Sequence, residues 1–434
     1  MFCNQCEQAK GGTGCDVIGI CGKDADVQSL QETLLYGLKG MAAYAHHARR
    51  LGKVDEAVDA FTEEALFATV TNVNFDIPTL LELVLECGKQ NLRVMQMLDE
   101  AHVEHYGKPQ VREVQIGTNV DGAAKPGILV TGHDLLDLEN LLKQVAGTDM
   151  RVYTHGEMLP AFMYPKLANH PNLAGHFGGA WQLQKNEFEA FGGAILATTN
   201  CILHPKPSYA DKLFTTRVTA VPGATRLKTD DFSAVIKRAQ EIGPLPVRKG
   251  ERIPVGFHHS VILDAAPAII DAVKKGEITR FFVIGGCDGA EPGRNYFSDF
   301  AKNAPQSSFI LTLGCGKYRI MGHDYGTLLG LPRLLDMGQC NNAYGAIQVA
   351  VGLAGAFNCG VNDLPLTIVL SWFEQKAVAV LLTLLHLGVK NITVGPAAPA
   401  WITPNIFKVL QDAYGLKLIG KDGKADVLEV CAVK

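Results

Sequence analysis

The sequence predicts an α/β protein in which an all-α three-helix bundle precedes two α/β domains with parallel sheets. Two observations predict this class. Apolar residues first recur at three- and four-residue steps, as on one face of a helix, and later form short apolar runs that alternate with helical segments. The length of 434 residues fits about three domains of ordinary size.

The N-terminal part of the chain predicts the bundle. Residues 1–23 are rich in Gly and Cys and lack periodicity, which indicates an irregular loop. The helices that follow are predicted at residues 24–52, 54–71 and 76–102, with Asp24 or Asp26 and then Asp76 at N-terminal caps and Gly52 as a stop. Short connections between these helices favour an antiparallel bundle, and we place the first domain at residues 1–110.

Beyond a turn-rich connector at 107–126, short apolar runs predict buried parallel strands. These runs lie at residues 127–131, 151–154, 194–198, 280–284, 308–312, 367–370 and 391–394. A stretch rich in proline and charge, residues 243–254, is typical of a linker. The sequence therefore divides the α/β part into domains at 111–250 and 251–434.

Composition excludes several classes of partner. With 47% apolar and 19% charged residues and a net charge of −4, the chain is predicted to be globular and to bind neither nucleic acid nor an anionic membrane. Its longest apolar run, residues 377–389, is shorter than the roughly 20 residues needed to cross a bilayer. The first residues lack the pattern of a secretory signal, so we expect a cytoplasmic protein.

Four of the eleven cysteines lie close together at the N-terminus. Cys3, Cys6, Cys15 and Cys21 have the spacing C-x2-C-x8-C-x5-C. Thiolates on a loop that can wrap suit either a tetrahedral zinc or an iron–sulfur cluster. Only the first pair is tightly spaced, which favours the cluster, but zinc and unrelated free thiols stay open.

A second group of metal-binding residue types follows the predicted strands. It consists of His133, Glu157, Cys201, Cys287, Cys315 and Glu374, which Cys340 could join. Ligands of open α/β sheets bind beyond the carboxyl ends of the strands, so these side chains are expected to converge. A single buried cysteine is more often a small apolar core residue, but seven such coincidences over two domains indicate a metal site. Thiolate, imidazole and carboxylate ligands together suit a multinuclear iron centre with sulfur and oxygen bridges and an open iron position.

Other candidates have no assigned chemistry. Cys87 falls in the third predicted helix, where core packing is favoured, and Cys359 and Cys431 do not follow a strand. The adjacent His258 and His259 are interpreted as satisfied core or loop residues.

At this point the sequence resembles the hybrid-cluster or prismane proteins, a family of hydroxylamine reductases, in a short form with one N-terminal helical bundle. The resemblance rests on motifs spread over nearly the whole chain. These are Met1-Phe-Cys-Asn-Gln-Cys6, Gly132-His-Asp134, Tyr153-Thr-His-Gly-Glu-Met-Leu-Pro160, Thr198-Thr-Asn-Cys201, Gly286-Cys-Asp-Gly289, Gly314-Cys-Gly-Lys-Tyr-Arg319, Gly338-Gln-Cys340 and Trp372-Phe-Glu-Gln-Lys-Ala-Val-Ala379. Longer relatives carry two bundles, whereas this chain has the length for one.

The resemblance implies two cofactors. Cys3, Cys6, Cys15 and Cys21 would hold a [4Fe-4S] cluster. The ligands of a hybrid [4Fe-2O-2S] cluster would be His133, Glu157, Cys201, Cys287, Cys315, Cys340 and Glu374. Cys287 matches a position that carries a persulfide, and Lys376 matches a lysine beside the cluster.

The activity implied is reduction of hydroxylamine to ammonia and water, with electrons from an external donor protein. Cys287, Glu374, Lys376, His133 and Glu157 are the expected catalytic residues, and the sequence does not rank them as proton donors. Reduction of nitric oxide, nitrosyl transfer through Cys287 and a nitrosative-stress sensor without turnover are the alternatives. Whether the chain forms a homo-oligomer is left open.

Overall fold

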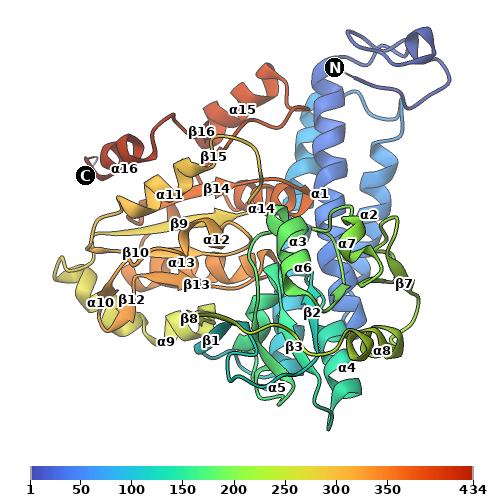
Figure 1. Ribbon diagram of the computed structural model, residues 1–434. Coiled ribbons are helices and arrows are strands. Elements are labelled where there is room, and N and C mark those ends of the chain that lie inside the picture. Colours follow the sequence, from blue (N-terminus) through green and yellow to red (C-terminus); the bar gives the residue numbers. More distant parts are fainter. Residues whose placement is uncertain (1, 433–434) are drawn as a thin grey trace.

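The structure, a computed structural model, describes residues 2–432 (Figure 1). It is an α/β protein, as the sequence predicts, and its three N-terminal helices lie beside two sheets. These helices are α1 (Ala25–Arg50), α2 (Glu56–Ala68) and α3 (Ile77–Tyr106). Asp24, Asp55 and Asp76 cap their N-termini by accepting backbone N–H groups, which satisfies donors that a helix leaves free. All three predicted helices are confirmed.

The first sheet has eight strands in the order β7-β6-β5-β2-β3-β4-β1-β8. In that order they span Thr225–Leu227, Leu213–Thr216, Ala194–Ala197, Gly127–Thr131, Arg151–Thr154, Leu173–His176, Arg112–Thr118 and Arg248–Val255. All neighbours are parallel except β1 and β8. The helices of this unit are α4 (Leu135–Val145), α5 (Pro165–Ala168), α6 (Gln184–Phe191), α7 (Pro207–Ala210) and α8 (Ser233–Ile242).

The second sheet has six parallel strands in the order β13-β10-β9-β14-β15-β16. In that order they span Leu334–Asp336, Ser308–Thr312, Arg280–Gly286, Leu366–Ser371, Thr393–Gly395 and Lys417–Leu418. Its helices are α9 (His259–Asp264), α10 (Ala266–Lys274), α11 (Asn295–Lys302), α12 (Lys317–Ile320), α13 (Ala343–Phe357), α14 (Gln375–His386), α15 (Pro404–Tyr414) and α16 (Gly423–Ala432). A small hairpin, β11 (Thr327–Leu328) and β12 (Leu331–Pro332), lies between β10 and β13 in the sequence.

Two sequence predictions about connecting segments are wrong. The expected connector at 107–126 contains β1, and the expected linker at 243–254 contains most of β8. These two strands pair at the edge of the first sheet, where polar and charged side chains face solvent, so neither shows the apolar run of a buried strand. The division of the chain at residue 250 stays a prediction, although β8 continues across that residue.

The N-terminal helices form their core together with α14, a helix of the second unit. A Cβ atom at Gly88 of α3 would lie 2.1 Å from the Leu382 carbonyl oxygen, and one at Gly40 of α1 would lie 2.4 Å from that of Gln375. Thr383 of α14 donates to the Gly88 carbonyl oxygen at 2.9 Å. Glycine is unfavourable inside a helix, and here it lets the backbone of α14 approach two helices closely. This packing fixes the start of α14, where Glu374 and Lys376 lie.

We therefore predict that Gly88→Ala destabilises the protein by about 3 kcal/mol, because the added methyl group overlaps the backbone of α14. Gly355→Ala in α13 is the matched control, since a Cβ at Gly355 would meet no atom within 4 Å. Alanine loses less backbone entropy than glycine when a helix folds. The Gly355→Ala variant should therefore be as stable as the parent protein, or more stable by up to about 1 kcal/mol. Anaerobic urea unfolding measures both, and equal stability of the two variants would contradict the packing described.

Candidate metal centre

The predicted ligands lie beyond the carboxyl ends of neighbouring parallel strands. His133, Glu157 and Cys201 follow β2, β3 and β5 of the first sheet. Cys287, Cys315, Cys340 and Glu374 follow β9, β10, β13 and β14 of the second sheet. Hydrogen bonds join the two edges: the Cys340 backbone N–H donates to Glu157 Oε2 at 2.8 Å, and Tyr318 Oη donates to the Gly156 carbonyl oxygen at 2.7 Å.

The closest group within this set is His133, Glu157 and Cys340. Their potential ligand atoms lie within 4.8 Å of one another, and His133 Nε2 is 3.9 Å from Glu157 Oε2. His133 and Glu157 are buried, and Cys340 is half-buried. One residue of the trio comes from the second sheet, so the group forms only when both units are in place.

The other predicted residues surround this trio and influence each other electrostatically. Burial and the Glu374 carboxylate raise the pKa of the Cys287 thiol to about 12, although the backbone N–H groups of Glu374 and Phe373 lower it. Burial also raises the pKa values of Cys201, Cys315 and Cys340, on which Glu157 acts in the same direction. Four thiols are therefore held among acidic groups at a site that disfavours their charged forms.

Lys376 supplies positive charge at this site. Burial alone lowers the pKa of its ammonium group, but Cys340, Glu374 and Cys201 outweigh that effect and raise the pKa above its usual value. The pKa of His133 is shifted well below its usual value, first by burial and then by Lys376. The site therefore holds a charged lysine beside a neutral imidazole, the form in which histidine binds metals.

Three buried polar atoms at the site have no hydrogen-bond partner within the described residues 2–432: His133 Nε2, Glu157 Oε1 and Lys376 Nζ. Buried polar atoms are nearly always paired, and leaving one unpaired costs about 1–3 kcal/mol. Three such atoms beside four thiols, of which Cys315 is buried and the others half-buried, fit a bound inorganic group. Soft thiolates and harder imidazole and carboxylate ligands together suit iron with both sulfur and oxygen bridges.

Thr199 positions the His133 ring. Its Oγ1 accepts the His133 backbone N–H at 2.9 Å and lies 2.9 Å from His133 Nδ1. With Nδ1 engaged in this way, Nε2 is the nitrogen that faces Glu157. Hydrogen bonds of this kind fix the orientation of a histidine that binds a metal.

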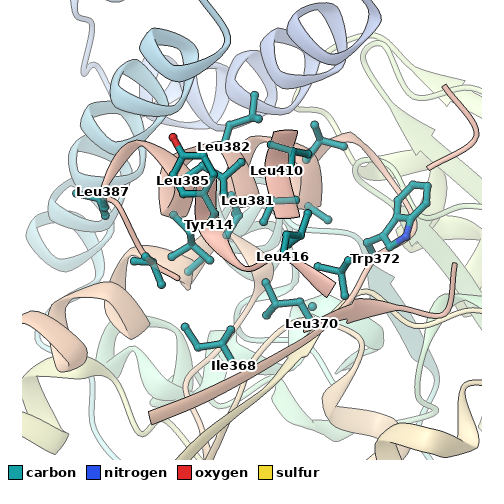
Figure 2. A pocket seen from close by; sticks show the side chains of 18 of the residues that line it. Ile368, Leu370, Trp372, Leu381, Leu382, Leu385, Leu387, Leu410, Tyr414 and Leu416 are labelled. Carbon is teal, nitrogen blue, oxygen red and sulfur yellow. The ribbon is translucent and has the colours of Figure 1, made fainter. Parts of the chain in front are cut away.

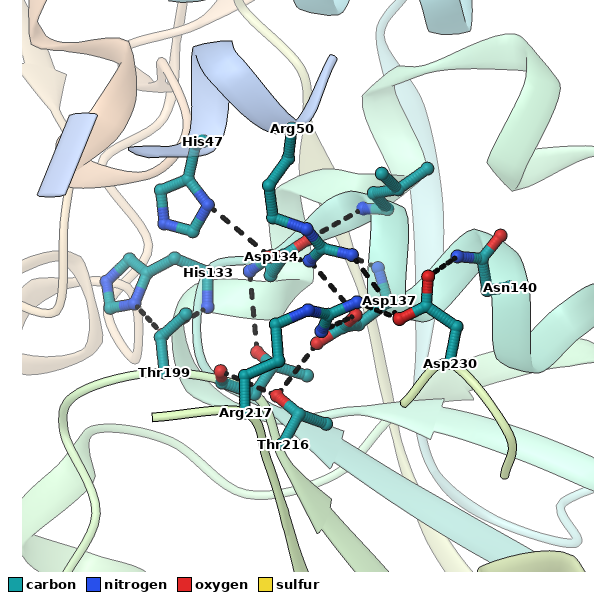
Figure 3. A network of polar contacts seen from close by, with 12 residues as sticks. His47, Arg50, His133, Asp134, Asp137, Asn140, Thr199, Thr216, Arg217 and Asp230 are labelled. Atoms are coloured by element: carbon teal, nitrogen blue, oxygen red, sulfur yellow. Dashed lines mark hydrogen bonds and ion pairs between the residues drawn. The ribbon is translucent and has the colours of Figure 1, made fainter. Parts of the chain in front are cut away.

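A buried network next to His133 connects α1 to the first sheet (Figure 3). Arg50 of α1 pairs with Asp134 and, at 3.0 Å, with Asp137, and Arg217 pairs with Asp137 at 2.6 Å. Asp134 also accepts the backbone N–H groups of Leu136 and Asp137 and so caps α4. Burial raises the pKa of Asp134, but His47 and Arg50 outweigh it and hold that pKa below its usual range.

The four N-terminal cysteines lie in a loop above the start of α1. The backbones of Cys3 and Cys15 form an isolated antiparallel β-bridge. Backbone hydrogen bonds from Lys10 and Ile20 lower the pKa of the Cys15 thiol. Two sulfurs on one zinc lie at most about 4.6 Å apart. Among the described residues, these cysteines form no group of three ligand atoms within 4.8 Å. In the described residues, the four sulfurs therefore do not lie at the mutual spacing of a tetrahedral zinc site.

Sequence reasoning missed three residues that shape the centre. Tyr44 of α1 is fully buried with its hydroxyl 3.5 Å from the Cys340 carbonyl oxygen, and Gln339 Nε2 donates to the carbonyl oxygens of Glu157 and His133. Thr199 is the third. Thr199 and Gln339 have a sequence signal, since they stand two residues before Cys201 and directly before Cys340. Tyr44 has none, because its contact with Cys340 joins distant segments.

An apolar cavity of about 390 Å³ reaches the centre from the second unit (Figure 2). Leu370, Leu382 and Leu385 are among its walls, and its lining also includes Cys287, Cys340 and Lys376. No described helix is long and apolar enough to cross a membrane.

The fold and the site together define an α/β protein with a candidate metal centre between two parallel sheets. Residues 1–84 and 76–423 match the Prismane/CO dehydrogenase family, and the chain belongs to that family. Iron–sulfur clusters are the cofactors that this family implies.

Two relatives are named hydroxylamine reductase. The protein of Moorella thermoacetica is 58% identical over 419 residues, which cover 96% of this chain and 97% of that protein. The protein of Thermotoga petrophila is 46% identical over 434 residues, which cover 100% of both. Among solved structures, carbon monoxide dehydrogenase IV from Carboxydothermus hydrogenoformans has a similar fold, with a TM-score of 0.79, 15% identity and coverage of 99% of this chain and 92% of that one.

We predict that Arg50→Met destabilises the protein by about 3 kcal/mol, because it removes the guanidinium group that pairs with the buried carboxylates of both Asp134 and Asp137. Arg49→Met is the control: Arg49 is the preceding residue, and its ion pair with Asp59 is exposed, so the loss should stay below about 1 kcal/mol. Urea unfolding at pH 7 compares the two variants. Similar losses would contradict a special role for the buried network.

Proposed function

We propose that this protein reduces hydroxylamine to ammonia and water at a buried cluster of iron, sulfur and oxygen. The observation that supports this most is the mixed set of thiol, imidazole and carboxylate groups around unpaired buried atoms, in a chain whose relatives are named hydroxylamine reductase. The reaction consumes two electrons and two protons. An external donor protein supplies the electrons, which enter at the N-terminal cysteines.

The residues proposed to hold the two clusters are the two groups that the sequence predicts. Cys3, Cys6, Cys15 and Cys21 would hold a [4Fe-4S] cluster. A hybrid [4Fe-2O-2S] cluster would be held by His133, Glu157, Cys201, Cys287, Cys315, Cys340 and Glu374, with Cys287 as the candidate for a persulfide. When bound, the hybrid cluster supplies electrons and an open iron position for a small nitrogen substrate.

Lys376 is the side chain best suited to assist cleavage of the N–O bond. Oxygen leaves as water only if a proton reaches it as the bond breaks. Lys376 Nζ is buried, charged and without a hydrogen-bond partner in the described part of the chain, so its N–H groups are free to donate to that oxygen. His133, whose pKa is lowered, is better suited to bind than to donate a proton. Glu374 directly precedes α14 and lies two residues before Lys376.

Cluster content is the first test. Anaerobic preparations should contain about eight iron atoms per chain, four for each cluster, together with acid-labile sulfide. The double variant Cys3→Ser, Cys6→Ser should lose about half of the iron and keep the EPR signals of the hybrid cluster. Zinc without iron would contradict the proposal for both sites.

Lys376→Met is the test of mechanism. With hydroxylamine and a reduced dye under anaerobic conditions, ammonia formation should fall by about 10²- to 10⁴-fold, the usual contribution of a proton donor. Lys376→Arg, which keeps the charge, should retain more activity. Iron content measured on the same samples serves as the control, and full activity of Lys376→Met with an intact cluster would remove Lys376 from the mechanism.

Nitric oxide reduction is the second candidate, and the apolar cavity favours it. An apolar gas partitions into a cavity walled by leucine side chains, and this one reaches Cys287, Cys340 and Lys376. Parallel assays with hydroxylamine, nitric oxide and an S-nitrosothiol separate these activities. Turnover of none of them by a fully loaded protein would favour a sensor of nitrosative stress.

A further inference from the structure

Lys23 is a fully buried cation at the junction of the cysteine loop and α1. Its Nζ donates to Gln31 Oε1 at 2.6 Å and to Gln28 Oε1 at 3.2 Å, and both acceptors are uncharged. Within residues 2–432, no carboxylate lies within 4.0 Å of this nitrogen. The carboxylate of Glu32 acts on Lys23 only from a longer distance, beside Gln28.

The Lys23 side chain starts close to a cysteine sulfur. A Cβ atom at Gly19 would lie 3.0 Å from Cys21 Sγ and 3.4 Å from Lys23 Cβ. The Gly19 backbone N–H also donates to the Lys23 carbonyl oxygen at 2.7 Å. Gly19 thus leaves room for both the Cys21 sulfur and Lys23 Cβ, and the ammonium group lies one side-chain length further, beside Gln28 and Gln31 of α1.

A buried ammonium group with only neutral partners is costly, because water solvates charge far better than two amide oxygens do. Four thiolates with iron carry net negative charge, and reduction adds one more negative charge. A fixed cation nearby stabilises the reduced form more than the oxidised form, since the Coulomb energy grows with the charge difference. Net charge and solvent exposure are among the factors that set the potential of an iron–sulfur cluster.

We propose that Lys23 is the counter-charge of the N-terminal cluster and raises its reduction potential, which favours uptake of electrons from the donor. This inference rests on the proposed function in one respect, that Cys3, Cys6, Cys15 and Cys21 hold an iron–sulfur cluster. Lys23 acts on that cluster through its charge and touches neither substrate nor the second site.

The loop contains its own matched control. Lys10 is the other basic residue of residues 1–23, and its side chain is 65% exposed and 3.7 Å from the Asp16 carboxylate. Water and Asp16 screen the Lys10 charge, so its removal should affect the cluster far less than removal of the Lys23 charge.

The experiment is an EPR-monitored redox titration of the full-length, anaerobically purified protein. The N-terminal cluster is identified as the signal lost in the variant Cys3→Ser, Cys6→Ser. In Lys23→Met, we expect the ratio of reduced to oxidised N-terminal cluster at a fixed potential to fall about tenfold. This corresponds to a reduction potential that is more negative by about 59 mV. The Lys10 charge acts on the Cys15 thiol, but only as a minor cause, so Lys10→Met should shift the potential far less than Lys23→Met does. Lys23→Arg should stay close to the parent protein.

Each result decides the question. An intact cluster whose potential is the same in Lys23→Met, or equally low in Lys23→Met and Lys23→Arg, overturns the role of the charge. If Lys23→Met does not retain the cluster, Lys23→Gln carries the same expectation, and loss of the cluster in both variants shows that Lys23 is only structural. Absence of a cluster at these cysteines in the parent protein overturns the proposed function as well, whereas an intact cluster with an unmoved potential overturns the inference alone.

Discussion

The backbone of α14 lies against the backbones of α1 and α3 at positions where only glycine leaves room, Gly40 and Gly88. This contact determines where α14 begins, and the residues at its start are Glu374 and Lys376. A shift of this helix by one turn would move both side chains by about 5.4 Å, more than the length of a hydrogen bond. The helical bundle therefore acts as the third wall of the centre, in addition to the two sheet edges.

The centre concentrates groups that disfavour one another's charge. Burial raises the pKa values of Glu157 and of the four thiols, and each negative charge that does form raises those of its neighbours. Two cations offset this effect: Lys376 acts on the thiols, and Lys317, itself paired with Asp336 at 2.6 Å, acts on Glu157 more strongly than Lys376 does. Two ammonium groups, one of them already paired, cannot neutralise four thiolates and two carboxylates, so the ionised set requires further positive charge. Bound iron would supply that charge, and metal binding and folding should then be coupled.

The sequence predicts the fold class and the strand ends that carry the candidate ligands. Buried parallel strands such as β2 and β9 have continuous apolar runs, and the candidate ligand positions follow directly from where these runs end. The edge strand β8 and its neighbour β1 were missed because polar residues interrupt their apolar pattern. The packing of α14 against α1 and α3 has no sequence signal. In the sequence, Gly40 and Gly88 only weaken a helix prediction. Their role is to make room for α14, a segment some 300 residues away.

Helix α1 connects the features that matter for electron and proton supply. Lys23 and the cysteine loop precede it, Gly40 contacts α14, Tyr44 approaches Cys340, and Arg50 pairs with Asp134 at its end. At 1.5 Å per residue, Ala25 and Tyr44 lie about 28 Å apart along the helix axis. At this separation two unit charges interact by only about 0.6 kcal/mol at an effective dielectric constant of about 20, so the Lys23 charge has little influence near Tyr44. The two lysines would then have separate roles, Lys23 where electrons would enter and Lys376 where bond cleavage would occur.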